Sequence, residues 1–143
     1  PTGRFGRLTS LTRLDLSGSL GLESLPDDVG QLLALTTIEL AHCPKLAAVA
    51  SSVYDLPNLL TVNLTGCASI TTVSASGAVA SRLETLLLEG CIGLTELPER
   101  ATGKLSKLNL LSLDGCLNLN KIPAWVVALE GRGCAVIRPQ HLR

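Results

Sequence analysis

The residues best suited to chemistry are cysteines that recur at a fixed interval. Cys43, Cys67 and Cys91 are evenly spaced, Cys116 follows one position later than this spacing predicts, and Cys134 lies outside the series. Cysteines can form disulfides or bind metals, but no C-x-x-C pair provides the usual zinc spacing. Side chains at equivalent positions of a repeat should point in parallel, whereas a disulfide needs converging Cβ atoms. We therefore expect buried structural thiols, no metal and no cofactor.

Two histidines, His42 and His141, complete the short inventory of groups that could transfer protons. His42 directly precedes Cys43, and neighbours in a strand point to opposite faces, so the pair has poor geometry for a catalytic dyad. The sequence contains no G-x-S-x-G or H-E-x-x-H motif, and residues 103–106 imitate only the end of a phosphate-binding loop. We therefore expect that the chain is not an enzyme.

The spacing of the cysteines belongs to a repeat that runs through the whole chain. When the repeats are aligned under one another, aliphatic residues recur at the same interval as the cysteines. They form three columns before the cysteine column and two after it. The three columns before the cysteines are Leu11, Leu35, Leu59, Leu83 and Leu108; Leu14, Ile38, Val62, Leu86 and Leu111; and Leu16, Leu40, Leu64, Leu88 and Leu113. Each repeat thus reads L-x-x-L-x-L-x-x-C-x-x-L-x-x-L-P.

Each repeat predicts one short strand followed by an outer turn. The alternation in L-x-L is typical of a strand whose leucines point inward. In residues 26–32, Pro26 marks a turn and Asp27 and Asp28 favour a helix start, so a short helix or 3-10 turn is predicted there. One repeat cannot bury its own apolar face, but stacked repeats share a continuous core beside a parallel sheet.

These repeats resemble the leucine-rich-repeat family. The form Gly-Cys-x-x-Leu-x-x-Leu-Pro stands in residues 90–98 and, with Ile122 as its last aliphatic residue, in residues 115–123. It is most similar to intracellular arrays of plant disease-resistance receptors and ROCO-type GTPases. The resemblance covers residue 8 to about residue 130. It implies an α/β fold: a right-handed solenoid with a parallel concave sheet and short helical or 3-10 outer segments. Residues 74–80 lack the proline and are rich in small side chains, so we expect a looser outer segment there.

The repeats predict a single domain over residues 1–143. We assign residues 1–10 to the end of a truncated repeat, 11–130 to five repeats of about 24 residues each, and 131–143 to a C-terminal cap strand and tail. Residues 1–8 align without gaps on residues 98–105, sharing a proline, a glycine, a basic residue and a leucine. The chain therefore starts in mid-repeat, and we expect it to be a piece of a longer array.

Charge and thiol content restrict the partner and the compartment. Twelve acidic residues balance twelve lysines and arginines, so the composition favours neither nucleic acid nor a membrane surface as partner. No apolar run reaches the roughly 18 residues that span a bilayer. Free thiols without a disulfide framework favour a cytoplasmic location. We interpret the sequon Asn63-Leu64-Thr65 as an accidental match, because a glycan at Asn63 would block the predicted binding surface.

The predicted binding surface consists of the outward residues beside each inward leucine pair, and we call it the sheet face. Its predicted contact residues are Arg13, Asp15, Thr37, Glu39, Thr61, Asn63, Thr85, Leu87, Glu89, Leu110, Ser112 and Asp114. We expect a mildly acidic surface with a band of threonines and an exposed apolar spot at Leu87 and Leu110. Such a surface would bind a protein or peptide of basic or mixed charge; the alternative is a solvated face without a partner.

The function that these observations favour is that of a non-catalytic protein-binding module within a larger intracellular signalling or immune-receptor-like protein. In a second interpretation, the repeats are the substrate-recognition domain of a bacterial effector enzyme. A third, an engineered or purely structural fragment, is disfavoured by the irregular residues 74–80. Five strands about 4.8 Å apart and roughly 15 Å long offer about 400 Å², half of what a standard interface takes from one partner. We therefore expect further repeats or the edges of the coil to enlarge the contact.

Overall fold

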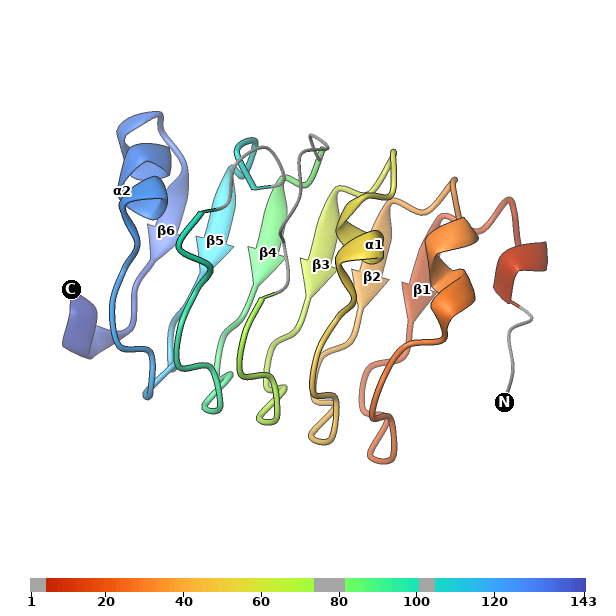
Figure 1. Cartoon of the computed structure of the whole chain (residues 1–143), viewed down its shortest axis with the longest axis horizontal. Coiled ribbons are helices and arrows are strands. Elements are labelled where there is room, and N and C mark those ends of the chain that lie inside the picture. Colours follow the sequence, from red (N-terminus) through yellow and green to blue (C-terminus); the bar gives the residue numbers. More distant parts are fainter. Residues whose placement is uncertain (1–4, 74–81, 101–104) are drawn as a thin grey trace.

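The sheet is the element that organises the chain. The structure is a computed structural model that describes residues 5–73, 82–100 and 105–143. Within these residues, six strands form one parallel sheet in sequence order (Figure 1). The strands are β1 (Arg13–Asp15), β2 (Thr37–Glu39), β3 (Thr61–Asn63), β4 (Thr85–Leu87), β5 (Leu110–Ser112) and β6 (Ala135–Ile137). Consecutive repeats therefore stack along one axis, and the predicted α/β solenoid with a parallel sheet is confirmed.

The register of the sheet follows the repeat residue for residue. The central inward column pairs Leu14 with Ile38, and continues through the equivalent residue of each later strand to Val136 of β6. Its members in β2 to β5 are fully buried, and Leu14 of the edge strand β1 is 7% exposed. A constant repeat length places the same side chain at the same height in every turn, so the core is one continuous aliphatic stack.

Short helical segments form the outer layer. They are η1 (Phe5–Arg7), η2 (Asp27–Gln31), α1 (Ser51–Tyr54), α2 (Ala124–Gly131) and η3 (Gln140–Leu142). Pro26 and Pro123 precede η2 and α2 with extended backbones, so their fixed φ angles set the start of each segment. Figure 1 shows η2, α1 and α2 on the same side of the sheet, so these three helices leave its other side uncovered. The looser segment predicted at residues 74–80 lies outside the described residues.

The cysteine column stacks the repeats through hydrogen bonds to backbone carbonyls. The Sγ of Cys67 donates to the carbonyl oxygen of Leu40 at 3.0 Å, and that of Cys91 donates to Leu64 at 3.1 Å. Cys43 and Cys116 make the equivalent bonds at 3.3 and 3.0 Å. All five cysteines are free and buried, so the prediction of structural thiols is confirmed. Burial raises the pKa of the Cys91 thiol to about 12, which keeps it protonated.

The loops after the strands continue the same ladder. The amides of Gly18, Gly66 and Gly90 donate to the carbonyl oxygens of the next repeat at 2.7 to 2.8 Å. These glycines and Gly115 have φ angles of 67° to 74°, and His42 takes the same position with φ 59°. A left-handed backbone favours glycine, so the recurring glycine sets the direction in which the chain leaves each strand.

Candidate binding surface

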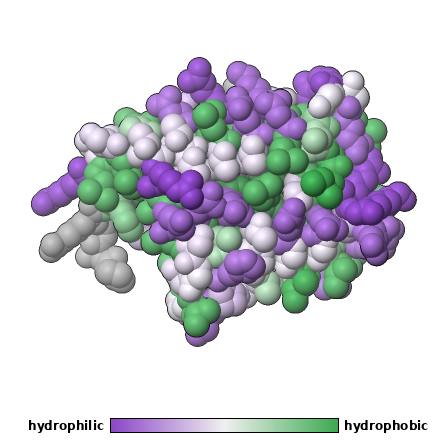
Figure 2. Space-filling model, turned by 180° about the vertical axis from the view of Figure 1, so that it is seen from behind, coloured by the Kyte–Doolittle hydropathy of each residue, from purple (hydrophilic) through white to green (hydrophobic). Residues whose placement is uncertain are grey.

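The sheet register places the predicted contact residues side by side on the uncovered face. One row runs from Arg13 in β1 through three threonines to Leu110 in β5, and the next row runs from Asp15 to Ser112. Glu89 and Asp114 lie two residues after the ends of β4 and β5. Figure 2 shows this face with apolar side chains gathered from its middle toward β6 and a polar cluster nearer β1. The two halves of the face therefore differ in polarity.

The N-terminal half, over β1 to β3, carries polar side chains that bind one another. The Arg13 guanidinium lies 3.6 Å from a Glu39 carboxylate oxygen and 3.8 Å from an Asp15 carboxylate oxygen. The Asn63 side-chain amide donates to Glu39 at 2.8 Å. Only 18% of the Glu39 side chain is exposed. These groups satisfy each other across the three strands, which leaves little unpaired charge for a partner.

The ends of the strands in this half are fixed by local side-chain turns. The backbone amide of Ser17 donates to Asp15 at 3.0 Å, and that of Thr65 donates to Asn63 at the same distance. The bond from Ser17 is the main reason why the pKa of the Asp15 carboxyl is lowered from its ordinary value, and the Arg13 charge adds to the effect. The carboxylate of Asp15 is thus stabilised in its charged form.

The C-terminal half, over β4 to β6, is apolar, and here the prediction of an exposed spot needs correction. Leu87 and Leu110 are half-buried, and Ser112, expected at the surface, is fully buried. In its row Ser112 lies between the larger side chains of Leu87 and Ile137, and its hydroxyl donates to Glu89 at 2.9 Å. A short side chain between two large ones loses contact with water even when it points outward.

The sixth strand adds residues that the sequence prediction of the site omitted. Ala135 and Ile137 extend the two rows beyond Leu110 and Ser112, and 40% of Ile137 is exposed. The Arg143 guanidinium lies 3.8 Å from Asp114. The sequence could have indicated Ala135 and Ile137, because they follow Leu110 and Ser112 by one repeat length. Nothing in the repeat pattern indicated Arg143, which reaches the face from beyond the last strand.

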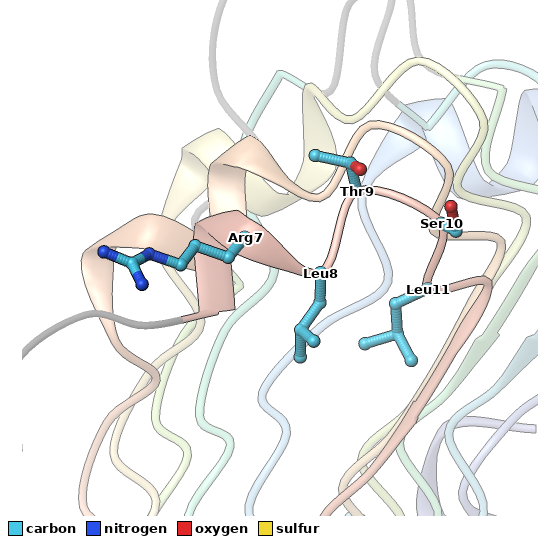
Figure 3. A pocket seen from close by; sticks show the side chains of 5 residues that line it. All are labelled: Arg7, Leu8, Thr9, Ser10 and Leu11. Carbon is cyan, nitrogen blue, oxygen red and sulfur yellow. The ribbon is translucent and has the colours of Figure 1, made fainter.

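Two shallow hollows lie at the ends of the sheet. One, of about 430 Å³, is lined by Val136, Ile137, Arg138 and Arg143. The other, of about 380 Å³, is lined by residues 7–11. Figure 3 shows Leu8 and Leu11 of this second hollow pointing to the same side, while Arg7 turns away. The lining residues of both hollows include no carboxylate, thiol or imidazole, so neither offers a group for acid–base chemistry.

The groups with catalytic potential do not converge. The Cys43 thiol is directed at the carbonyl of Leu16, and His42 is exposed, with its Nδ1 2.4 Å from where a Cβ on Gly66 would lie. This arrangement agrees with the poor dyad geometry expected from their adjacency. Among the described residues, no group of three or more His, Cys, Asp and Glu side chains is placed to hold a metal ion. None of the helices in the described part of the chain has the length and apolarity to cross a membrane.

Comparisons with known proteins find a likeness among solved structures. No protein-family model matches the sequence, and no curated protein matches it significantly. Among solved structures, the leucine-rich-repeat domain of the type III effector XopL is similar over 85% of this chain, with 29% sequence identity and a TM-score of 0.75. The chain spans 40% of the length of that solved chain. The likeness supports the repeat family but not its plant-type branch. With its recurring aliphatic columns and its six parallel strands in register, the chain therefore has the fold of a leucine-rich-repeat domain.

Proposed function

We propose that the chain is a non-catalytic protein-binding module of a larger protein, and that it binds its partner with the sheet face. The observation that carries this proposal is the apolar C-terminal half of that face (Figure 2), which includes Leu87, Leu110 and Ile137. None of the helices in the described residues lies over it (Figure 1). Curved or flat repeat sheets of this kind provide extended binding surfaces. Partly exposed aliphatic side chains beside acidic residues suit a partner with apolar anchors and basic or mixed charge.

The larger protein that would contain this module has two candidate contexts. An intracellular signalling or immune-receptor-like protein is supported by the five free cysteines, which suit a reducing compartment. The recognition domain of an effector is supported by the likeness to the XopL repeat domain. In both contexts the sheet face selects a protein, and the rest of the larger protein acts on the result of that binding.

Peptide selection against the purified chain would test the sheet face. Peptides would be selected from a random display library, and their affinities measured by fluorescence anisotropy against the wild type and the double variant Leu87→Ala with Ile137→Ala. Removing two apolar anchors should weaken binding at least about tenfold. Raising the salt concentration should weaken it further, because the acidic rim of the face attracts basic peptides.

A matched control uses aliphatic side chains that are exposed on the helical side. Leu33 and Val127 are 59% and 51% exposed and lie just after η2 and in α2, away from the sheet face. The variant Leu33→Ala with Val127→Ala removes a similar amount of apolar side chain, so it should leave peptide affinity unchanged. Selected peptides that bind both double variants as tightly as the wild type would refute the sheet face as the binding site.

A further inference from the structure

A line of exposed apolar side chains runs along the loops that follow the strands, at a position that the repeat pattern leaves free. It consists of Leu20, Pro44, Ala68, Ile92 and Leu117, each one residue after the cysteine column or its serine equivalent, and we call it the loop stripe. Ala68, in the middle of the stripe, is half-buried, and the other four members are exposed. Leu20, Ile92 and Leu117 are 72%, 48% and 68% exposed. Core packing explains none of these side chains, since all three point into solvent. Figure 2 shows separate apolar side chains along the lower margin of the molecule, where these loops lie in Figure 1.

The backbone beneath the loop stripe is fixed. The Ser69 hydroxyl donates to the carbonyl of Pro44 at 2.6 Å, and the Asn118 amide donates to the carbonyl of Ile92 at 2.7 Å. Gly93 packs so closely on Ala68 that an added Cβ would lie 2.3 Å from its carbonyl oxygen. Because neighbouring loops are held together in this way, the stripe side chains keep a regular spacing, and a partner need not order them on binding.

The spacing of the loop stripe favours a helical partner. Strands about 4.8 Å apart make the five-residue stripe roughly 19 Å long. An α-helix lying along it presents one side chain per turn at intervals of about 5.4 Å, or roughly 22 Å over four turns. An extended peptide repeats its side chains at about 6.7 Å, or roughly 27 Å over four steps. Over the stripe the helix is too long by about 3 Å and the extended peptide by about 8 Å, so the helix fits the stripe better.

The charges around the loop stripe specify the flanks of that helix. Within four residues of a stripe member the chain carries the acids Glu23, Glu89, Glu96 and Asp114, against the lysines Lys45 and Lys121. Lys121 forms an ion pair with Glu99, and Asp114 lies 3.8 Å from the Arg143 guanidinium, which reduces the effect of both charges on a partner. The remaining charges of this border are three glutamates against Lys45, so the border is still acidic. An acidic border attracts basic side chains and repels an anionic membrane surface or a second copy of the same stripe.

We propose that the loop stripe is a second docking surface, distinct from the sheet face, for an amphipathic α-helix of another protein with basic residues beside its apolar stripe. Apolar residues of that helix at positions i, i+4, i+7, i+11 and i+14 contact the five residues of the stripe. The basic flanks lie over the acidic border. One chain then binds two partners, or two segments of one partner, at the same time.

The probe for this proposal is a synthetic helical peptide of about 16 residues, with leucines at i, i+4, i+7, i+11 and i+14 and lysines beside them. Binding to the wild-type chain would be measured by fluorescence anisotropy and mapped by amide chemical shifts. The variant Ile92→Glu with Leu117→Glu should weaken binding at least about tenfold, because it places acids where the leucines dock. A peptide with the same composition in scrambled order, and one with glutamates replacing the lysines, should bind weakly or not at all.

The control variant Leu33→Glu with Val127→Glu changes two exposed aliphatic side chains outside the stripe and should bind the peptide like the wild type. Equal binding to the stripe variant, or no binding of the helical peptide to the wild type, would overturn the proposal. So would a wild-type dimer that the stripe variant loses in sedimentation, or anionic vesicles that bind the stripe. Weakening by Leu87→Ala with Ile137→Ala alone would assign the peptide to the sheet face, which overturns the loop stripe and leaves the proposed function standing.

Discussion

Strands β1 to β3 and strands β4 to β6 have the same length, register and core column. On the sheet face, however, the first three strands carry polar side chains and the last three carry mainly apolar ones. Over β1 to β3, Arg13, Glu39 and Asn63 are paired with one another. Over β4 to β6, Leu87 and Ile137 have no such pairing and flank a buried serine. In the first half, the polar side chains bond to one another. The second half is an apolar surface, and covering it with a partner would lower the free energy.

The difference shows where a repeat protein is free to vary. The inward positions must be aliphatic in every turn, since each turn covers the next. The outward positions carry no such requirement, so two halves built on one template can differ in chemistry. The loops after the strands differ in packing for another reason, because Gly93 lies against Ala68 of the preceding repeat, whereas Gly21 lies in the first repeat and a Cβ there would meet nothing within 4 Å.

The largest effect is expected from introducing a charge into the apolar half. Ser112→Asp puts a carboxylate in a fully buried position next to Glu89, and should lower the free energy of unfolding by about 3 kcal/mol. Asn63→Asp, at the same row position in the polar half, is only half-buried and should cost about 1 kcal/mol through the lost bond to Glu39. Urea denaturation followed by circular dichroism would measure both. Equal losses would mean that the two halves do not differ in burial.

The next largest effect concerns the loops of the two halves. Gly93→Ala forces a methyl group to within 2.3 Å of the Ala68 carbonyl oxygen, and backbone cannot move aside cheaply. We expect a loss of about 1 to 3 kcal/mol in the free energy of unfolding. Gly21→Ala, at the equivalent position of the first repeat, should change stability by less than about 0.5 kcal/mol. A thermal melt in which Gly21→Ala is the less stable of the two would contradict the packing described for this loop.

The smallest effect is a pH dependence confined to the polar half. The pKa of Asp15 is lowered in the folded chain, so its carboxylate contributes stability that is complete above the ordinary value of 3.8 and is lost as the pH falls through the folded pKa. Between about pH 5 and about pH 3, Asp15→Asn should therefore lose less stability than the wild type. Glu23→Gln, which removes an exposed carboxylate outside the sheet face, serves as the control. Parallel losses in Asp15→Asn and the wild type would show that the bond from Ser17 has no energetic effect.

The agreement between sequence and structure is best where one repeat constrains the next. The inward column, the parallel register and the buried cysteines were all predicted, because an error at any of these positions would disrupt a stack of identical turns. The sequence also predicted that short helices or 3-10 turns, such as η2 and α1, form the outer segments. Their exact lengths depend on local packing and could not be read from the repeat.

The candidate site was predicted less completely than the core. Alternation correctly placed Arg13, Glu39 and Leu87 on one face, but it gave no information about how much of each side chain water reaches. Ser112 is buried because of the size of its neighbours, and Arg143 reaches the face from a segment outside the repeat. The loop stripe was missed because the aliphatic core columns carry no information about the residue after each cysteine.

The sequence alone determined the solenoid, because a constant period of buried aliphatic side chains has a stable arrangement only when successive turns stack. It also determined which residues point outward, since strand geometry alternates regardless of what surrounds it. Only the tertiary structure decided which outward residues form a polar network, which remain available to a partner and which are covered. Those outcomes depend on side-chain sizes and distances between neighbouring turns, and no single turn contains that information.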